Sequence, residues 1–517
     1  MTHRTKADAE GRCRFALTEA PNPELIKERK NQMKRIIALV LALVLVFALV
    51  GCGDKGPQIV HVTLDAADSE AILAAAGIQL PPVEEAAGAN TTLRWLSWYD
   101  SFHNYDEDEI VNTGFFTFSE KYGGDVEWIE CDYFERLNDL ATLILSEDPP
   151  DFTPTGTNAT ATYPMSCMKG QYQAVDPYID YDDPLWQGMK ETADYFVLGG
   201  QHYNIVIDLA VANVIPYNTR VIAEWGFDDP AELYYNDEWT WDVFYEMCED
   251  FSDGDENRYA LDGYAYAGAL VESTGQQMLQ IDENGIFYSN LDSPEIERAE
   301  NLIYDIAKND LKYHEGTSMW ALRNNATFGA GMKEGDCLFY PIGISFFTDT
   351  VEEISAIWGD VAAGELMFAP MPRDPQGDGN YYICCAIDAY AIVKGAANPE
   401  GVALLASCDR FKVIDPTVID IDAKQLRETY LWNDDMMAMR EECYNIAVAN
   451  PRIDLTGDLP SNLNDVIGRL GNDIIRSVEP ATWAQIKESN REAFEYYIAE
   501  LNADIAEFNE TGEAVTG

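Results

Sequence analysis

Short apolar segments alternate with longer amphipathic segments from Leu93 onward, and this alternation constrains the fold more than any other feature of the chain. Leu93 to Asp100 is a predicted strand that ends in a polar loop. A helical segment follows and ends at Gly123-Gly124. Val126 to Ile129 is then a second short strand.

The alternation continues beyond the second strand. Asp132 and Glu135 have the spacing of a capping box, which predicts a helix start. Pro149-Pro150 ends that helix, and a third strand begins at Asp151-Phe152. This β-α-β-α-β order predicts an α/β lobe.

Three later helices have clear start signals. Ser293-Pro294-Glu295 and Asn398-Pro399-Glu400 each place a capping residue, a proline and an acid in their preferred positions. Thr482 and Gln485 form a capping box for a last helix that extends toward Asn509.

An apolar, uncharged run extends from Ile36 to Val50, after Lys34-Arg35 and before Gly51-Cys52. Its fifteen residues are fewer than the ~20 that a spanning helix needs, and the arrangement is typical of a secretory signal. The end of the run resembles the lipobox of bacterial lipoproteins, which implies that Cys52 is diacylated and becomes the first mature residue. The alternative is a short membrane anchor with a chance cysteine.

These features predict the boundaries of the chain's front part. Residues 1–32 precede a good start at Met33 and are expected to be an over-extended start. Residues 33–51 are the signal peptide. Residues 52–90, rich in Ala, Gly, Pro and acid, are expected to be a flexible tether.

The net charge of −56 comes from 34 basic and 90 acidic residues. Residues 1–51 hold 9 of the basic and 5 of the acidic residues, which leaves the mature part with a net charge of −60. Such a surface repels phosphate backbones, so nucleic acid is excluded as a partner. We attribute the acid to solubility outside the cell.

Enzymatic signatures are absent from the sequence. It has no HExxH, GxSxG or P-loop motif, so no catalytic residues and no cofactor are predicted. Eight cysteines follow Cys52 without zinc spacing, and no metal site is predicted. Their number suggests buried thiols from an anaerobic source, with disulfides as the alternative. Because acids are plentiful, a glycosidase remains a candidate.

A series of motifs appears in a characteristic order. They are Phe118–Gly123, Leu145–Asp151, Gln173–Ile179, Gly200–Ile205, Tyr217-Asn218, Trp225–Phe227, Trp239–Asp242, Phe328–Gly331 and Asn398–Gly401. This order resembles the family 1 extracellular solute-binding proteins, the relatives of maltose-binding protein, over about residues 91–410. The remaining hundred residues match only in helical character.

The resemblance implies a two-lobed fold of the type II periplasmic-binding-protein class. Lobe 1 is expected to hold residues 91–208 and about 384–415, and lobe 2 residues 209–383 and about 416–517. The chain is expected to cross between the lobes near 207–211, near 381–383 and after about 415. Ligand binding in the cleft then closes the lobes.

The function implied is that of the substrate-binding lipoprotein of an ABC importer. It would capture an oligosaccharide and deliver it to the permease subunits, as a monomer held by its lipid on the outer face of a Gram-positive membrane. Two alternatives stay open: the same scaffold binding a peptide or polyol, and a cell-surface glycosidase or adhesin.

Sugars bind to aromatic faces and to polar groups that reach their hydroxyls, so aromatic and polar residues at strand ends are the candidate ligand contacts. Trp98, Tyr99 and Asp100 leave the first strand at the edge where doubly wound folds bind ligands. Their alternative role is a surface cap. The resemblance adds Asp151 and Asp208, of which Asp151 is equally compatible with a structural cap.

The second lobe supplies further candidates. Tyr264 and Tyr266 lie among small residues, and we predict that Tyr266 faces Trp98 across the cleft. Phe346 lies near the place where relatives have a stacking tryptophan, a pattern from which this chain departs. Arg452 is expected either to enter the cleft or to form a surface ion pair.

Overall fold

The computed structural model describes residues 58–88, 90–133, 135–156, 162–314, 323, 328–472 and 479–514. Cys52 and the apolar run before it lie outside these residues, so the lipidation prediction is not addressed by them. Within the described ranges, no helix combines the length and the apolar character needed to cross a bilayer.

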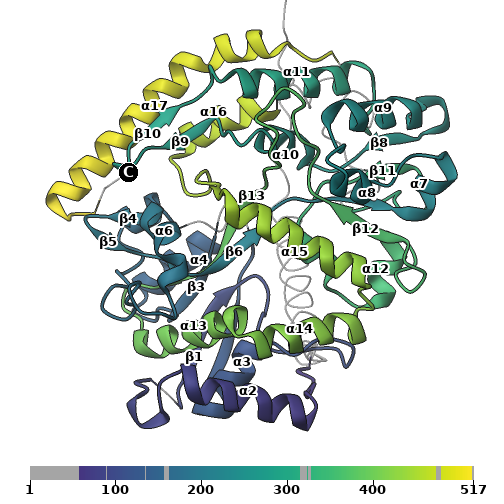
Figure 1. The fold of residues 1–517 in the computed structure, drawn as a ribbon. Coiled ribbons are helices and arrows are strands. Elements are labelled where there is room, and N and C mark those ends of the chain that lie inside the picture. The colour runs from purple at the N-terminus through teal and green to yellow at the C-terminus, as the bar shows by residue number, and fades with distance from the viewer. Residues whose placement is uncertain are drawn as a thin grey trace, which may run out of the picture. The chain divides into compact units, whose positions relative to one another are not determined.

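A six-stranded sheet organises the first part of the fold (Figure 1). Its strands are β1 (Thr92–Ser97), β2 (Asp125–Glu130), β3 (Phe152–Thr155), β6 (Ile205–Val211), β13 (Cys384–Ile392) and β14 (Arg452–Ile453). Their order is β14-β13-β3-β1-β2, and β6 also pairs with β13. β1 is parallel to both β2 and β3, whereas β13 is antiparallel to β3. The predicted α/β class is therefore confirmed.

Helices between these strands cover the sheet because their apolar faces need burial. They include α3 (Thr113–Tyr122), α4 (Arg136–Leu145) and α13 (Pro399–Ile414), and α13 packs against both α3 and β6. In the core, the Trp95 ring lies 4.5 Å from Phe152 and 5.4 Å from Tyr390.

Local capping signals predicted most of the tested helix starts. The Ser293 hydroxyl accepts from two backbone N–H groups at the start of α11 (Pro294–Lys308), and Asn398 caps α13. The Thr482–Gln485 capping box opens α17 (Trp483–Thr511). The box expected at Asp132 does not form: a turn from Asp132 to Glu135 comes first, and α4 begins only after it.

The chain leaves the six-stranded sheet after Val211 and returns to it at Cys384. In between, three small strand pairs form: β7 (Ile215–Asn218) with β12 (Leu366–Ala369), β8 (Tyr259–Leu261) with β11 (Cys337–Phe339), and β9 (Leu279–Ile281) with β10 (Phe287–Ser289). Helices α9 (Trp241–Phe251), α10 (Tyr266–Glu272) and α11 belong to this region, and α16 (Ser461–Asn472) packs against α10 and α17.

Part of the expected tether is a folded helix, α2 (Ala66–Gln79). Ile72 and Ala76 on this helix are fully buried. α2 packs against α3 and α14 (Pro416–Thr429), and Lys424 of α14 lies 2.9 Å from two aspartates at the start of α2. α14 therefore lies with α2 and α13, although the expected boundaries put it in lobe 2.

The eight cysteines from Cys131 to Cys443 are all buried and free of disulfides in the described structure. They fill core positions as small apolar side chains, which agrees with the buried-thiol interpretation.

Candidate ligand-binding site

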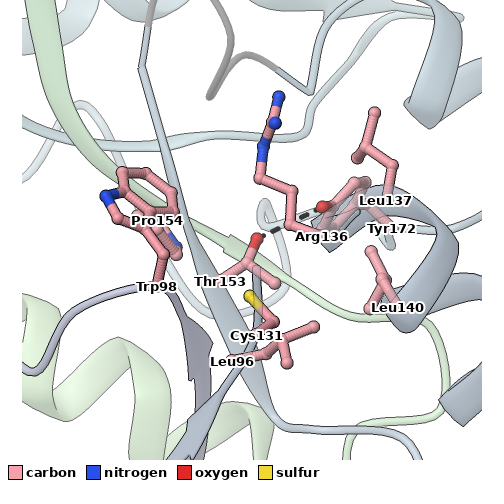
Figure 2. A pocket seen from close by; sticks show the side chains of 9 residues that line it. All are labelled: Leu96, Trp98, Cys131, Arg136, Leu137, Leu140, Thr153, Pro154 and Tyr172. Carbon is pink, nitrogen blue, oxygen red and sulfur yellow. Dashed lines mark hydrogen bonds between the residues drawn. The ribbon is translucent and has the colours of Figure 1, made fainter. Parts of the chain in front are cut away.

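The order of the parallel strands creates a crevice at one edge of the sheet. β1 lies between β2 and β3, so the chain turns to one side after β1 and to the other side after β2. In open α/β sheets, ligands bind at the carboxyl ends of the strands at such a switch point. Figure 2 shows the pocket at this edge, lined by Leu96, Trp98, Cys131, Arg136, Leu137, Leu140, Thr153, Pro154 and Tyr172.

Trp98 and Tyr133 form the aromatic part of this edge. Trp98 follows the end of β1 and Tyr133 follows the end of β2, and both side chains are half-buried. Their ring centroids lie 5.1 Å apart in an edge-to-face arrangement. The Arg136 guanidinium lies 5.1 Å from the centroid of the Tyr133 ring and donates a hydrogen bond to the Tyr133 carbonyl.

Three aromatic residues of the region between β6 and β13 form a second group. Tyr264 is 42% exposed and its ring lies 5.9 Å from that of Phe328, which in turn lies 5.3 Å from Phe346. Burial raises the pKa of Tyr264, and the nearby Tyr133 hydroxyl adds to this shift. The two groups are therefore close enough to interact electrostatically, although they come from different parts of the chain.

Tyr99 joins these residues through Trp98, whose ring lies 5.0 Å away. We use the name aromatic recess for Trp98, Tyr99, Tyr133, Tyr264, Phe328 and Phe346. Tyr99 is 44% exposed, yet burial, aided by Asp388, raises its pKa to about 12.

Asp388 on β13 resembles Tyr99, because its side chain is exposed and its pKa is nevertheless raised. Its side chain is exposed, but burial raises its pKa to about 6, and Lys412 opposes the shift. Asp388 lies directly opposite Asp208 of β6. Asp208 accepts a hydrogen bond of 2.7 Å from the Tyr444 hydroxyl and lies 3.7 Å from Arg410, and burial raises its pKa.

The side chains of Asp100 and Asp151 are buried and hydrogen-bonded within the protein, so they are not open to a ligand. The Asp100 side chain is 1% exposed and holds the His103 ring and the Tyr105 hydroxyl, each at 2.7 Å. Asp151 is 3% exposed, and its two oxygens accept from the backbone N–H groups of Arg94 and Asn398. Both carboxylates are occupied in holding loops together.

Tyr266 does not lie where it was expected, and the entry of Arg452 into the cleft stays a prediction. Tyr266 is fully buried at the start of α10, so it presents no surface to Trp98, whereas the neighbouring Tyr264 is exposed. Arg452 is half-buried on β14, and its guanidinium lies 5.3 Å from the centroid of the Tyr382 ring.

Sequence reasoning missed Tyr133, Arg136, Phe328 and Asp388. Tyr133 and Arg136 follow the end of β2, so the strand-end rule that singled out Trp98 could have found them. Asp388 interrupts an otherwise apolar strand, which is a second usable signal. No sequence signal distinguishes Phe328.

No family model matches this sequence, and no curated protein is similar to it. Solved structures are similar in fold. An ABC substrate-binding protein from Listeria monocytogenes in complex with cycloalternan has 14% identity and a TM-score of 0.55 over 80% of this chain and 99% of its own.

Two further structures have comparable similarity. The galacto-N-biose-/lacto-N-biose I-binding protein of Bifidobacterium longum has 13% identity and a TM-score of 0.55 over 83% of this chain and all of its own. A solute-binding protein of Thermotoga lettingae bound to alpha-D-tagatose has 17% identity and a TM-score of 0.53, covering 80% of this chain and 99% of its own. The chain therefore has the two-lobed, periplasmic-binding-protein-like fold of the ABC-transporter solute-binding proteins.

Proposed function

We propose that this chain is the extracellular substrate-binding lipoprotein of an ABC importer and that it captures an oligosaccharide. The aromatic recess is the observation that carries this proposal. Aromatic rings pack well against the C–H faces of sugars, and Trp98, Tyr133 and Tyr264 supply such rings at the strand edge. Proteins of similar fold were solved with cycloalternan and lacto-N-biose, which supports the same ligand class here.

Different residues of this site have different roles in binding the sugar. Trp98 and Tyr133 hold the sugar from the sheet edge, and Tyr264, whose ring packs against Phe328, holds it from the other region. Asp388, the Tyr99 hydroxyl and Arg136 supply acceptors and donors for sugar hydroxyls. The connections at 211–215 and before Cys384 serve as hinges, because a ligand that contacts both regions favours the closed state.

The protein binds and releases its ligand unchanged and passes it to the permease subunits. It acts as a monomer and needs no cofactor. Among the described residues, Asp208 and Asp388 face each other as a carboxylate pair that could suggest a glycosidase, but Tyr444 and Arg410 hold Asp208 within the protein.

A calorimetric titration panel tests this function. It contains α- and β-linked oligosaccharides, polyols and short peptides. We expect saturable binding of at least one oligosaccharide, with compaction of the protein in X-ray scattering and no change in the glycan. Binding of only polyols or peptides would reassign the cargo, and steady release of reducing sugar would show an enzyme.

Membrane attachment through Cys52 is the second part of the proposal. The apolar run at 36–50 and the exit residues before Cys52 support it. Cys52→Ser should release the protein from the outer face of the cell membrane into the medium. Retention of the variant after signal cleavage would contradict the anchor.

A further inference from the structure

A second cavity, of about 170 Å³, shares no lining residue with the pocket in Figure 2. It lies among α10, α11, α16 and the segment that follows β14. Its charged lining residues are Glu272, Glu300 and Asp454, and we call it the acidic cavity. Its volume is far above the ~15 Å³ that a single water needs.

Glu300 is the most unusual group of this cavity. It lies on the buried stripe of α11, next to Ala299 and close to Ile303, and is only 2% exposed. Its carboxyl group has no hydrogen bond and no ion pair with any described residue. Burial alone raises its pKa well above the usual range. The buried Tyr266 hydroxyl, close enough to Glu300 to feel its charge, also has no hydrogen bond with any described residue, and the Lys312 ammonium lies 5.8 Å from the centroid of the Tyr266 ring.

Glu272 and Asp454 are the other two acids. Burial, reinforced by Asp454, raises the pKa of Glu272 to about 8, and only Asn213 and Cys384 offset this shift. The Asn213 amide donates to Glu272 at 3.3 Å. Burial also raises the pKa of Asp454, although the backbone N–H and hydroxyl of Thr456 donate to it. No lysine or arginine is among the described lining residues.

The walls of the cavity are apolar and leave open space. Ala267, Val271 and Ile467 contribute to them. Gly268 on α10 and Gly471 on α16 both face the space, and a Cβ added at either would meet no atom within 4 Å. Glycine within a helix costs about 1 kcal/mol relative to alanine, and at these positions it keeps the cavity open.

We propose that the acidic cavity binds a small organic ammonium ion, with the ammonium group against Glu300 and the alkyl part against the apolar walls. An ammonium group has three donors and no acceptor, which suits an unpaired buried carboxylate. A buried charge is tolerated when an opposite charge accompanies it. The carboxyl groups do not converge into a metal site, since no group of three potential ligands among the described residues is close enough.

The pKa values predict how binding depends on pH. The cation binds the ionised carboxylates, so binding must displace protons from Glu300 and Glu272. Affinity should therefore rise as the pH rises toward and through about 8, the pKa of Glu272. An uncharged molecule of the same shape should show no such dependence.

The test uses n-butylammonium as the probe and n-butanol as the uncharged control, with the mature protein at pH 8. Calorimetry in two amine-free buffers, phosphate and borate, should show saturable binding of n-butylammonium with proton release, and a raised melting temperature. Glu300→Gln should weaken this binding at least tenfold. Glu283→Gln, at an exposed turn, is the matched control and should behave like the wild type.

Gly268→Leu provides a second variant, because it fills the cavity and leaves every acid in place. It should also abolish binding of the probe. Equal responses to n-butylammonium and n-butanol, or an unchanged affinity in Glu300→Gln, would overturn the proposal. Oligosaccharide binding should be the same in all three variants, so this result is independent of the aromatic recess.

Discussion

The aromatic recess and the acidic cavity are two hollows in one chain, built in opposite ways. The recess combines rings from the ends of β1 and β2 with rings from the region between β6 and β13, and these rings are half-buried or exposed. The cavity holds carboxyl groups from two helices and a strand end, of which Glu300 is buried and Glu272 and Asp454 are half-buried. Most acids of this chain lie on the surface, where they are solvated and do not indicate a ligand. An unpaired buried acid such as Glu300 does indicate one, because a buried charge needs an opposite charge beside it.

The two hollows should also differ in their energetics. Partly exposed rings contribute little to folding, so their removal should weaken binding and leave stability almost unchanged. Buried acids cost stability, so their removal should change stability even without a ligand.

The largest difference should appear as pH dependence of the acidic cavity. Glu272 has a folded pKa of about 8, above its usual value. Its contribution to stability is therefore fully present below the unfolded pKa and is lost as the pH rises through about 8. This contribution should fall by on the order of 3 kcal/mol between pH 5 and pH 8. Denaturant unfolding of the wild type and of Glu272→Gln across this range measures it, and parallel curves would contradict the burial of this charge.

The second-largest effect is a loss of oligosaccharide affinity in variants of the aromatic recess. Trp98→Ala and Tyr264→Ala should each weaken the best oligosaccharide by about 2 kcal/mol, roughly thirtyfold, because each removes a ring from a desolvated contact. Their melting temperatures should stay close to that of the wild type. Tyr496→Ala is the control, since Tyr496 is 57% exposed on α17. Unaltered affinity in both recess variants, measured by calorimetry, would place the ligand elsewhere.

A smaller effect concerns Glu300 alone. Glu300→Met replaces an unpaired buried acid by an apolar side chain of similar length, and we expect about 1–2 kcal/mol of added stability at pH 8. Urea unfolding without any amine in the buffer checks this value. A loss of stability would show that Glu300 has a stabilising partner, and the proposed cation site would lose its main support.

The smallest effect tests the open space itself. Gly268→Ala should stabilise the protein by about 0.5–1 kcal/mol, because alanine favours the helix and its Cβ meets no atom within 4 Å. Gly401→Ala is the opposite case, since a Cβ there would lie 2.4 Å from the Asn398 amide and should destabilise the protein. Thermal melts of both variants separate an open glycine from a crowded one.

The sequence predicted part of the aromatic recess but nothing of the acidic cavity. Trp98 and Tyr99 were predicted because strand ends can be located from local patterns. The choice between Tyr264 and Tyr266 could not be made in this way, because the two residues share the same small neighbours. α10 begins at Tyr266 and turns that ring into the core, while Tyr264 stays outside the helix. The acidic cavity gave no signal, since its acids come from three distant segments.

The sequence by itself determined the features that depend on neighbouring residues. These are the order of strands and helices, the caps at Ser293, Asn398 and Thr482, and the alternation that defines the α/β class. Only the tertiary structure decided features that depend on distant contacts. α2 is folded because α14, more than 300 residues later, covers it, and Tyr264 interacts electrostatically with Tyr133, which comes from a distant part of the chain. Local side-chain bonds act within a few residues, whereas burial depends on which segments the fold brings into contact.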